Sequence, residues 1–214
     1  MAISRDTPAN ATANGITSAT LPSHVAGDYI IGIAFRDGNT TPPTIPAGWT
    51  TIDNSIGANS CSIAAGYLVA SSSSEVSGTW SSATTVIFAV YSGVGGIGGF
   101  TQTGGSGTTV TYGTVTMSVG TGTSWVVAFG GHRSANTTIS NSGSEPSGLT
   151  LINTAEDATD EAGMFDSAAG VTSYTTNNVA VGGTSSGWRT IVIELLATVA
   201  GTTNAAHGML MGMG

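Results

Sequence analysis

The sequence predicts an all-β protein: an antiparallel two-sheet sandwich, jelly-roll-like, with extended arms at both ends. Bulky and small residues alternate in several short runs, turn-forming residues separate the runs, and no stretch of ten residues has the 3.6-residue period of a helix. Only 7% of the 214 residues are charged, but 40% are hydrophobic, which is enough to form a core. We therefore expect helix to make up less than about 10% of the chain.

The elements are expected in a simple order. Residues 1–24 are mostly small and polar, are interrupted by prolines and glycine, and should form an extended N-terminal arm. Residues 25–199 should form the sandwich domain, and residues 200–214 a glycine- and methionine-rich tail without acidic or basic side chains other than one histidine. Within the domain, strands are expected over residues 26–36, 48–52, 62–70, 80–93, 109–119, 125–129 and 188–196. The glycine-rich stretch 94–107 contains no recognisable helix.

The alternation also predicts the core. In the strand over 26–36, Ile31 and Ile33 share one face while Gly32 and Ala34 lie on the other. The side chains that should be mostly buried are Ile31, Ile33, Phe35, Tyr67, Phe88, Val90, Val127, Phe129, Ile191 and Ile193.

Three blocks of the sequence recur about a hundred residues later in the same order. IPAGWTTIDN (45–54) aligns with EPSGLTLINT (145–154), AGYL (65–68) with AGMF (162–165), and TVIFAV (85–90) with TIVIEL (190–195). Chance alignment in a chain rich in glycine, serine and threonine is the alternative. We interpret the blocks as a quasi-duplicated sandwich.

Charge excludes two classes of partner. The chain has no lysine, and its four arginines face twelve acids, for a net charge of −8. Without a basic patch, neither nucleic acid nor an anionic lipid surface is an expected partner. The N-terminus lacks the pattern of a signal peptide, and no apolar run approaches the length of a membrane span. The single cysteine, Cys61, cannot form an internal disulfide and is expected to be a partly buried, inert thiol.

Two glycine motifs resemble known sites but lack their context. Residues 93–98 satisfy G-x-G-x-x-G, yet the residues after Gly98 cannot form the helix that a dinucleotide site requires. Residues 183–187 satisfy G-x-S-x-G, but a strand comes next where a nucleophile elbow needs a helix, so a turn is expected. We expect no cofactor.

The acids and histidines do not form an evident catalytic or metal site. Glu194 lies in an expected strand without a second strand-borne acid, and is expected to face outward or to pair with an arginine. The acidic run could collect calcium, but its spacing favours a solvated loop; it comprises Glu156, Asp157, Asp160 and Glu161. The histidines have no metal-binding spacing; they are His24, His132 and His207. We expect neither an enzyme nor a metal site.

The tryptophans are candidates for a sugar-binding platform. Trp125 and Trp188 begin core strands, which favours packing over sugar stacking. Trp49 and Trp80 are the other two candidates.

One stretch resembles a known family. AGDYIIGIAF, PAGWT, AGYLVASSS and TTVIFAVYSGV occur in this order, which resembles a module of tailed-bacteriophage virion proteins found in capsid decoration (cement) proteins and in tail-fibre adhesins. The module's usual form is AGD, an apolar strand, P-x-G-W, and a closing strand that ends in GV. The resemblance covers residues 26–94, and reaches 124–198 only through the internal repeat. The second copy has Leu149 in place of Trp49 and no AGD.

The resemblance implies a structural protein of the virion, assembled in the host bacterial cytoplasm. The expected function is an oligomeric, trimeric decoration protein that binds the major capsid protein and copies of itself. The alternative is a tail or fibre adhesin that binds host-surface carbohydrate. Contact with the partner is expected from the two arms, through Met1, Ile3, Arg5, Met209, Leu210, Met211 and Met213.

Overall fold

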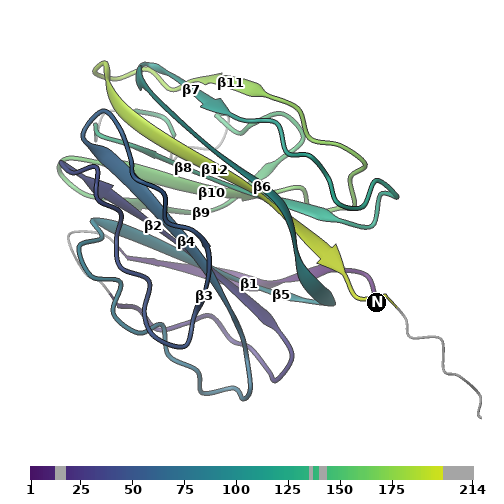
Figure 1. The fold of residues 1–214 in the computed structure, drawn as a ribbon. Coiled ribbons are helices and arrows are strands. Elements are labelled where there is room, and N and C mark those ends of the chain that lie inside the picture. Colours follow the sequence, from purple (N-terminus) through teal and green to yellow (C-terminus); the bar gives the residue numbers. More distant parts are fainter. Residues whose placement is uncertain (13–17, 135–136, 140–143, 200–214) are drawn as a thin grey trace, which may run out of the picture.

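Two five-stranded antiparallel sheets pack face to face in a sandwich (Figure 1). The structure is a computed structural model that describes residues 1–12, 18–134, 137–139 and 144–199. Within these ranges the chain forms strands, turns and loops and no helix, as the predicted all-β class requires.

Each sheet is built from one half of the chain. The first has the order β1-β5-β2-β4-β3. Its strands are β1 (Ser4–Thr12), β2 (Tyr29–Asp37), β3 (Thr50–Asp53), β4 (Cys61–Val69) and β5 (Thr85–Ser92). The second sheet has the order β6-β12-β8-β10-β9. Its strands are β6 (Val94–Gly107), β8 (Trp125–His132), β9 (Thr150–Glu156), β10 (Glu161–Asp166) and β12 (Ser186–Ala197). A separate ribbon pairs β7 (Thr109–Tyr112) with β11 (Asn177–Ala180).

The strand order is the same in both sheets when strands are matched through the recurring blocks. These blocks match β3 with β9, β4 with β10, and β5 with β12. Placing β1 opposite β6 and β2 opposite β8 then makes the two orders identical. The turn before β3 also recurs before β9: Gly48 and Gly148 both have positive φ, and the next residue's N–H donates to a proline carbonyl in each case.

Burial follows the predicted alternation. Of the ten predicted core side chains, nine are buried and Tyr67 is half-buried. Ile31 and Ile33 of β2 join Val127 and Phe129 of β8 in the cluster between the sheets. Phe88 and Val90 instead lie on the outer face of the first sheet, beneath loops. Apolar side chains therefore cover both faces of the central strands.

Gly32 allows an aromatic cluster to pack against the outer face of the first sheet. A Cβ at this position would lie 2.7 Å from a ring atom of Trp80 and 2.9 Å from atoms of Phe88 and Trp49. Trp49 and Trp80 meet edge to face, with ring centroids 5.2 Å apart. Their close approach to the strand therefore requires glycine at position 32.

Two expectations about the elements need correction, one strand was not predicted, and the jelly-roll form is not confirmed. Residues 4–12 of the expected arm form the edge strand β1, which pairs with β5. The glycine-rich stretch 94–107 forms the longest strand, β6, and the strand expected over 109–119 is limited to β7. A jelly-roll connection, in which the chain passes repeatedly between sheets, is not seen among the strands described, because the first sheet is complete before the second begins.

Candidate functional site

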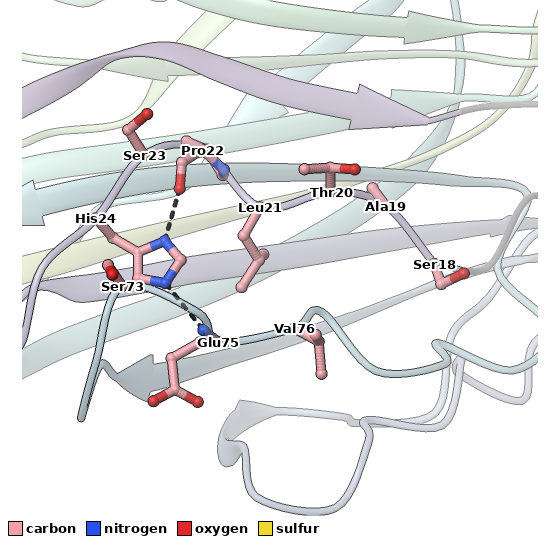
Figure 2. Close-up of a pocket in the computed structure, with 10 residues that line it drawn as sticks. All are labelled: Ser18, Ala19, Thr20, Leu21, Pro22, Ser23, His24, Ser73, Glu75 and Val76. Atoms are coloured by element: carbon pink, nitrogen blue, oxygen red, sulfur yellow. Dashed lines mark hydrogen bonds between the residues drawn. The ribbon is translucent and has the colours of Figure 1, made fainter.

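A large hollow lies over the outer side of the first sheet (Figure 2). Residues 18–24 form one wall and residues 73, 75 and 76 the other, around a cavity of about 590 Å³. Leu21 anchors the first wall, because its side chain is buried in the same cluster as Trp80 and Phe88. The N–H of Ala19 also donates to the Ser77 hydroxyl at 2.9 Å.

His24 joins the two walls through hydrogen bonds at both of its ring nitrogens. Its Nδ1 lies 2.6 Å from the Pro22 carbonyl oxygen, and its Nε2 lies 3.2 Å from the Glu75 backbone nitrogen (Figure 2). A carbonyl can only accept and an N–H can only donate, so Nδ1 carries the proton and Nε2 accepts. Both ring nitrogens are therefore occupied, and His24 has no lone pair free for a metal or a substrate proton.

The Glu75 carboxylate caps a neighbouring turn. It accepts hydrogen bonds from the Ser71 hydroxyl at 2.6 Å and the Ser71 N–H at 3.0 Å, and it points away from the His24 ring (Figure 2). Because these bonds favour the ionised form, the pKa of Glu75 is below its ordinary value. The wall residues offer hydroxyls and backbone groups to a polar ligand, but no nucleophile next to a free base.

The expectation that Glu194 faces outward or pairs with an arginine is wrong. Its side chain is buried against the segment that follows the ribbon strand β7. Oε2 accepts from the N–H groups of Gly99 (3.0 Å) and Ser118 (2.6 Å). Oε1 accepts from the N–H of Val119 (3.2 Å) and the hydroxyl of Ser124 (2.8 Å). Burial would raise the pKa of Glu194, but these bonds hold it below its ordinary value, so this acid has a structural role.

The acidic run is only partly a solvated loop. Glu156 and Asp157 are not buried, but Asp160 and Glu161 are. Glu161 accepts hydrogen bonds from the N–H and hydroxyl of Thr137. Across the part of the chain that the structure describes, no group of three or more potential metal-ligating side chains occurs.

Asp160 is buried in the turn between β9 and β10, where it contacts Thr84, the residue before β5. The Thr84 hydroxyl donates to its Oδ2, while Oδ1 is buried without a hydrogen-bond partner. Burial raises the pKa of Asp160 to about 7, far above its ordinary value of 3.8. Its protonation therefore changes near neutral pH.

The tryptophans pack rather than form a platform. Trp80 and Trp188 are buried. Trp49 contacts Trp80 and Phe88, and Trp125 lies edge to face with Tyr91 at a centroid distance of 6.3 Å. Packing, the role that the sequence favoured for Trp125 and Trp188, thus accounts for all four.

The expected contact residues at the N-terminus differ from one another. Met1 is 83% exposed, and its ammonium group donates to the carbonyl and hydroxyl oxygens of Thr198. Ile3 is buried in the core between the sheets. Arg5 pairs with buried Asp166 at 2.8 Å, and Tyr91 donates to the same carboxylate oxygen. Ile3 and Arg5 therefore both serve the chain's own fold. The expected contacts in the tail lie outside the described residues: Met209, Leu210, Met211 and Met213.

The remaining motifs have structural explanations. Cys61 is buried, and burial raises the pKa of its thiol to about 11, which makes it a poor nucleophile. The G-x-G-x-x-G stretch runs into β6, and no helix follows it. The G-x-S-x-G stretch is a turn that leads into β12, as predicted.

The hollow beside His24 had no signal in the sequence. Its walls come from segments about fifty residues apart, and neither wall contains a motif. Only the packing of both segments on the outer face of the first sheet brings them together.

No protein-family description matches the chain, and neither a curated protein nor a solved structure is significantly similar to it. Within the described ranges, no helix is long and apolar enough to cross a membrane.

Proposed function

We propose that the protein is a non-enzymatic structural component of a bacteriophage virion, an oligomeric decoration protein on the head shell. The resemblance of residues 26–94 to virion modules suggests the particle, and the structural use of the acids favours a non-enzymatic role. The buried acids are Asp28, Asp53, Asp160, Glu161, Asp166 and Glu194. Each of them accepts a hydrogen bond from its own chain. Because all six are buried in the fold, they are poorly placed for acid–base work on a substrate.

The proposed partners are the major capsid protein and further copies of this chain, with a trimer as the proposed assembly. Because Ile3 and Arg5 are engaged internally, attachment is assigned to the tail, residues 200–214. Its methionines and leucine are adaptable apolar groups that suit an irregular groove between capsomers. Several tails in one oligomer would multiply a weak contact through effective concentration.

Deletion of residues 200–214 tests this assignment. The truncated chain should keep the wild-type circular dichroism spectrum and unfolding midpoint, but it should occupy fewer sites on heads that lack the protein, as counted by electron microscopy. A matched control replaces the same tail with Gly-Ser repeats of equal length. If both variants decorate heads at wild-type occupancy, attachment lies elsewhere on the chain.

We also propose that the two halves arose by duplication. The identical strand order supports this, and so does the packing between the sheets. β1 contacts β9, and the matched pair β6 and β3 is also in contact. Likewise, β5 contacts β10 as β12 contacts β4, and β2 contacts its own counterpart β8. These pairs are what an approximate two-fold axis between β2 and β8 would produce.

A glycan-binding adhesin is the second candidate, and the hollow beside His24 favours it. Its walls carry the hydroxyls of Ser18, Thr20, Ser23 and Ser73. Binding to a glycan array, lost in Ser73→Tyr but kept in Thr172→Tyr at an exposed position outside the hollow, would support the adhesin. Absence of binding to bacterial surface glycans, together with occupancy of heads, would support the decoration protein.

A further inference from the structure

The outer edge of β6 has the character of an interface. β6 is the last strand of the second sheet and pairs on one side only, with β12. Among the described residues, no backbone group outside β12 is hydrogen-bonded to the segment 100–107. Alternate N–H and C=O groups along this segment therefore point away from the sheet, and no neighbouring strand forms hydrogen bonds with them.

The other edges of the two five-stranded sheets are protected. β1 carries Arg5 and Asp6, and its pairing is interrupted around Pro8. β3 has only four residues. β9 contains a register shift and ends at Glu156. Charge, proline, short length and bulges are the usual devices that prevent strands from pairing between molecules.

The second half of β6 lacks all of these devices. Its two register shifts fall within 94–100, and from Phe100 to Gly107 the pairing with β12 is continuous. This segment, FTQTGGSG, has no charge and no proline. Phe100 is 47% exposed at its start. Ile56, which is 78% exposed, lies near its end, since the Ile56 carbonyl accepts from Arg189, the β12 partner of Gly104.

We propose that residues 100–107 pair with the same residues of a second copy of this chain, antiparallel across a two-fold axis. The local charge permits this occupant: each copy has a net charge of −8, which opposes self-association, but the segment 100–107 is uncharged and brings the two chains together without opposing any acids along the strand. Self-pairing also places this unprotected edge against an identical one, so neither strand carries a feature that would prevent the contact. Full overlap places Phe100 opposite Gly107 and Thr103 opposite Gly104, and it joins two five-stranded sheets into one of ten strands.

This inference goes beyond the proposed function: it does not depend on binding to a capsid, and it gives a dimer where the head-shell proposal gives a trimer. The first measurement is sedimentation velocity of the full chain over a range of concentrations. The expected species is a dimer of the 21.1 kDa chain. The double variant Phe100→Asp/Ser106→Asp should raise the dimer dissociation constant at least tenfold, because it places a carboxylate near each end of the paired segment in both copies. The matched control, Val76→Asp/Thr172→Asp, changes two exposed positions away from this edge and should leave the constant unchanged.

Hydrogen exchange locates the contact independently of any variant. Amides in 100–107 should exchange slowly at concentrations where the dimer forms and faster on dilution, while exchange in β1, β3 and β9 should not depend on concentration. A monomer at all concentrations overturns the inference. A dimer or trimer whose association resists the Asp variants, with no concentration-dependent protection in 100–107, also overturns it but leaves the decoration proposal standing.

Discussion

At the scale of single residues, Asp160 gives the fold a pH dependence of unusual sign for a carboxylate. Its pKa is about 7 in the folded chain against 3.8 as the ordinary value, so the folded state holds this proton more tightly. As pH rises from about 4 to about 7, the unfolded chain loses the proton while the folded chain keeps it. This residue therefore lowers the free energy of unfolding across that window, and its effect levels off above it.

Asp160→Asn should flatten this fall in stability between pH 4 and pH 7, as measured by urea unfolding at a series of pH values. Asp157→Asn is a control from the same hairpin with the opposite sign. Although burial alone would raise the pKa of Asp157, hydrogen bonds from Thr159 and Asp160 lower it, so its stabilisation is lost as pH falls. An identical pH dependence in wild type and Asp160→Asn would contradict the role given to Asp160.

Phe88 tests the packing of the outer aromatic cluster. It is fully buried, with ring centroids 5.7 Å from Trp49 and 5.9 Å from Trp80. Phe88→Ala should lower the free energy of unfolding by about 3–5 kcal/mol, because it leaves a cavity beneath two rings. A loss below about 1 kcal/mol in denaturant unfolding would mean that the loops over this face contribute little.

At the scale of elements, β1 belongs to the sandwich and is not part of a free arm. It adds the outermost strand beside β5, and its Arg5 neutralises Asp166 of the opposite sheet. Arg5→Met should lower the free energy of unfolding by about 3 kcal/mol, since it leaves a buried carboxylate without its cation.

Deleting residues 1–12 should lower the free energy of unfolding further, because the edge of β5 and the core around Ile3 are then uncovered. Thermal unfolding of both variants, with the tail deletion as the control that should not change, checks this. An unchanged midpoint in the 1–12 deletion would restore the expectation of a free arm.

Most of the strands that the sequence predicted share one property. β2, β4, β5, β8 and β12 are rich in apolar residues that alternate with a period of two, and central strands of a sandwich must bury them. β1 and β6 lack this signal because polar residues or glycines occupy them. Their structure depends on backbone hydrogen bonds to β5 and β12, which no local pattern encodes. The role of Glu194 was missed for a similar reason: its donors come from segments about 70 to 95 residues away.

At the scale of the whole molecule, the assembly state separates the two proposals about self-association. Pairing through β6 predicts a dimer, whereas the resemblance to virion proteins implies a trimer. The mass of the free protein in solution distinguishes them directly. A trimer whose dissociation is unaffected by Phe100→Asp/Ser106→Asp would favour the head-shell proposal and place the contact away from β6.

The division of the chain into one sheet per half also bears on the order of synthesis. Every strand that pairs with β1 to β5 lies before residue 93, so the first sheet has all its strands while the ribosome is still adding the second half. Until β8, β10 and β12 emerge, its inner row of Ile31, Ile33 and Ile87 has no surface to cover it. During translation, a nascent chain of this protein thus presents an adhesive apolar face for the time needed to make about a hundred residues. Slow decoding in the second half would lengthen that exposure and favour aggregation of neighbouring nascent chains.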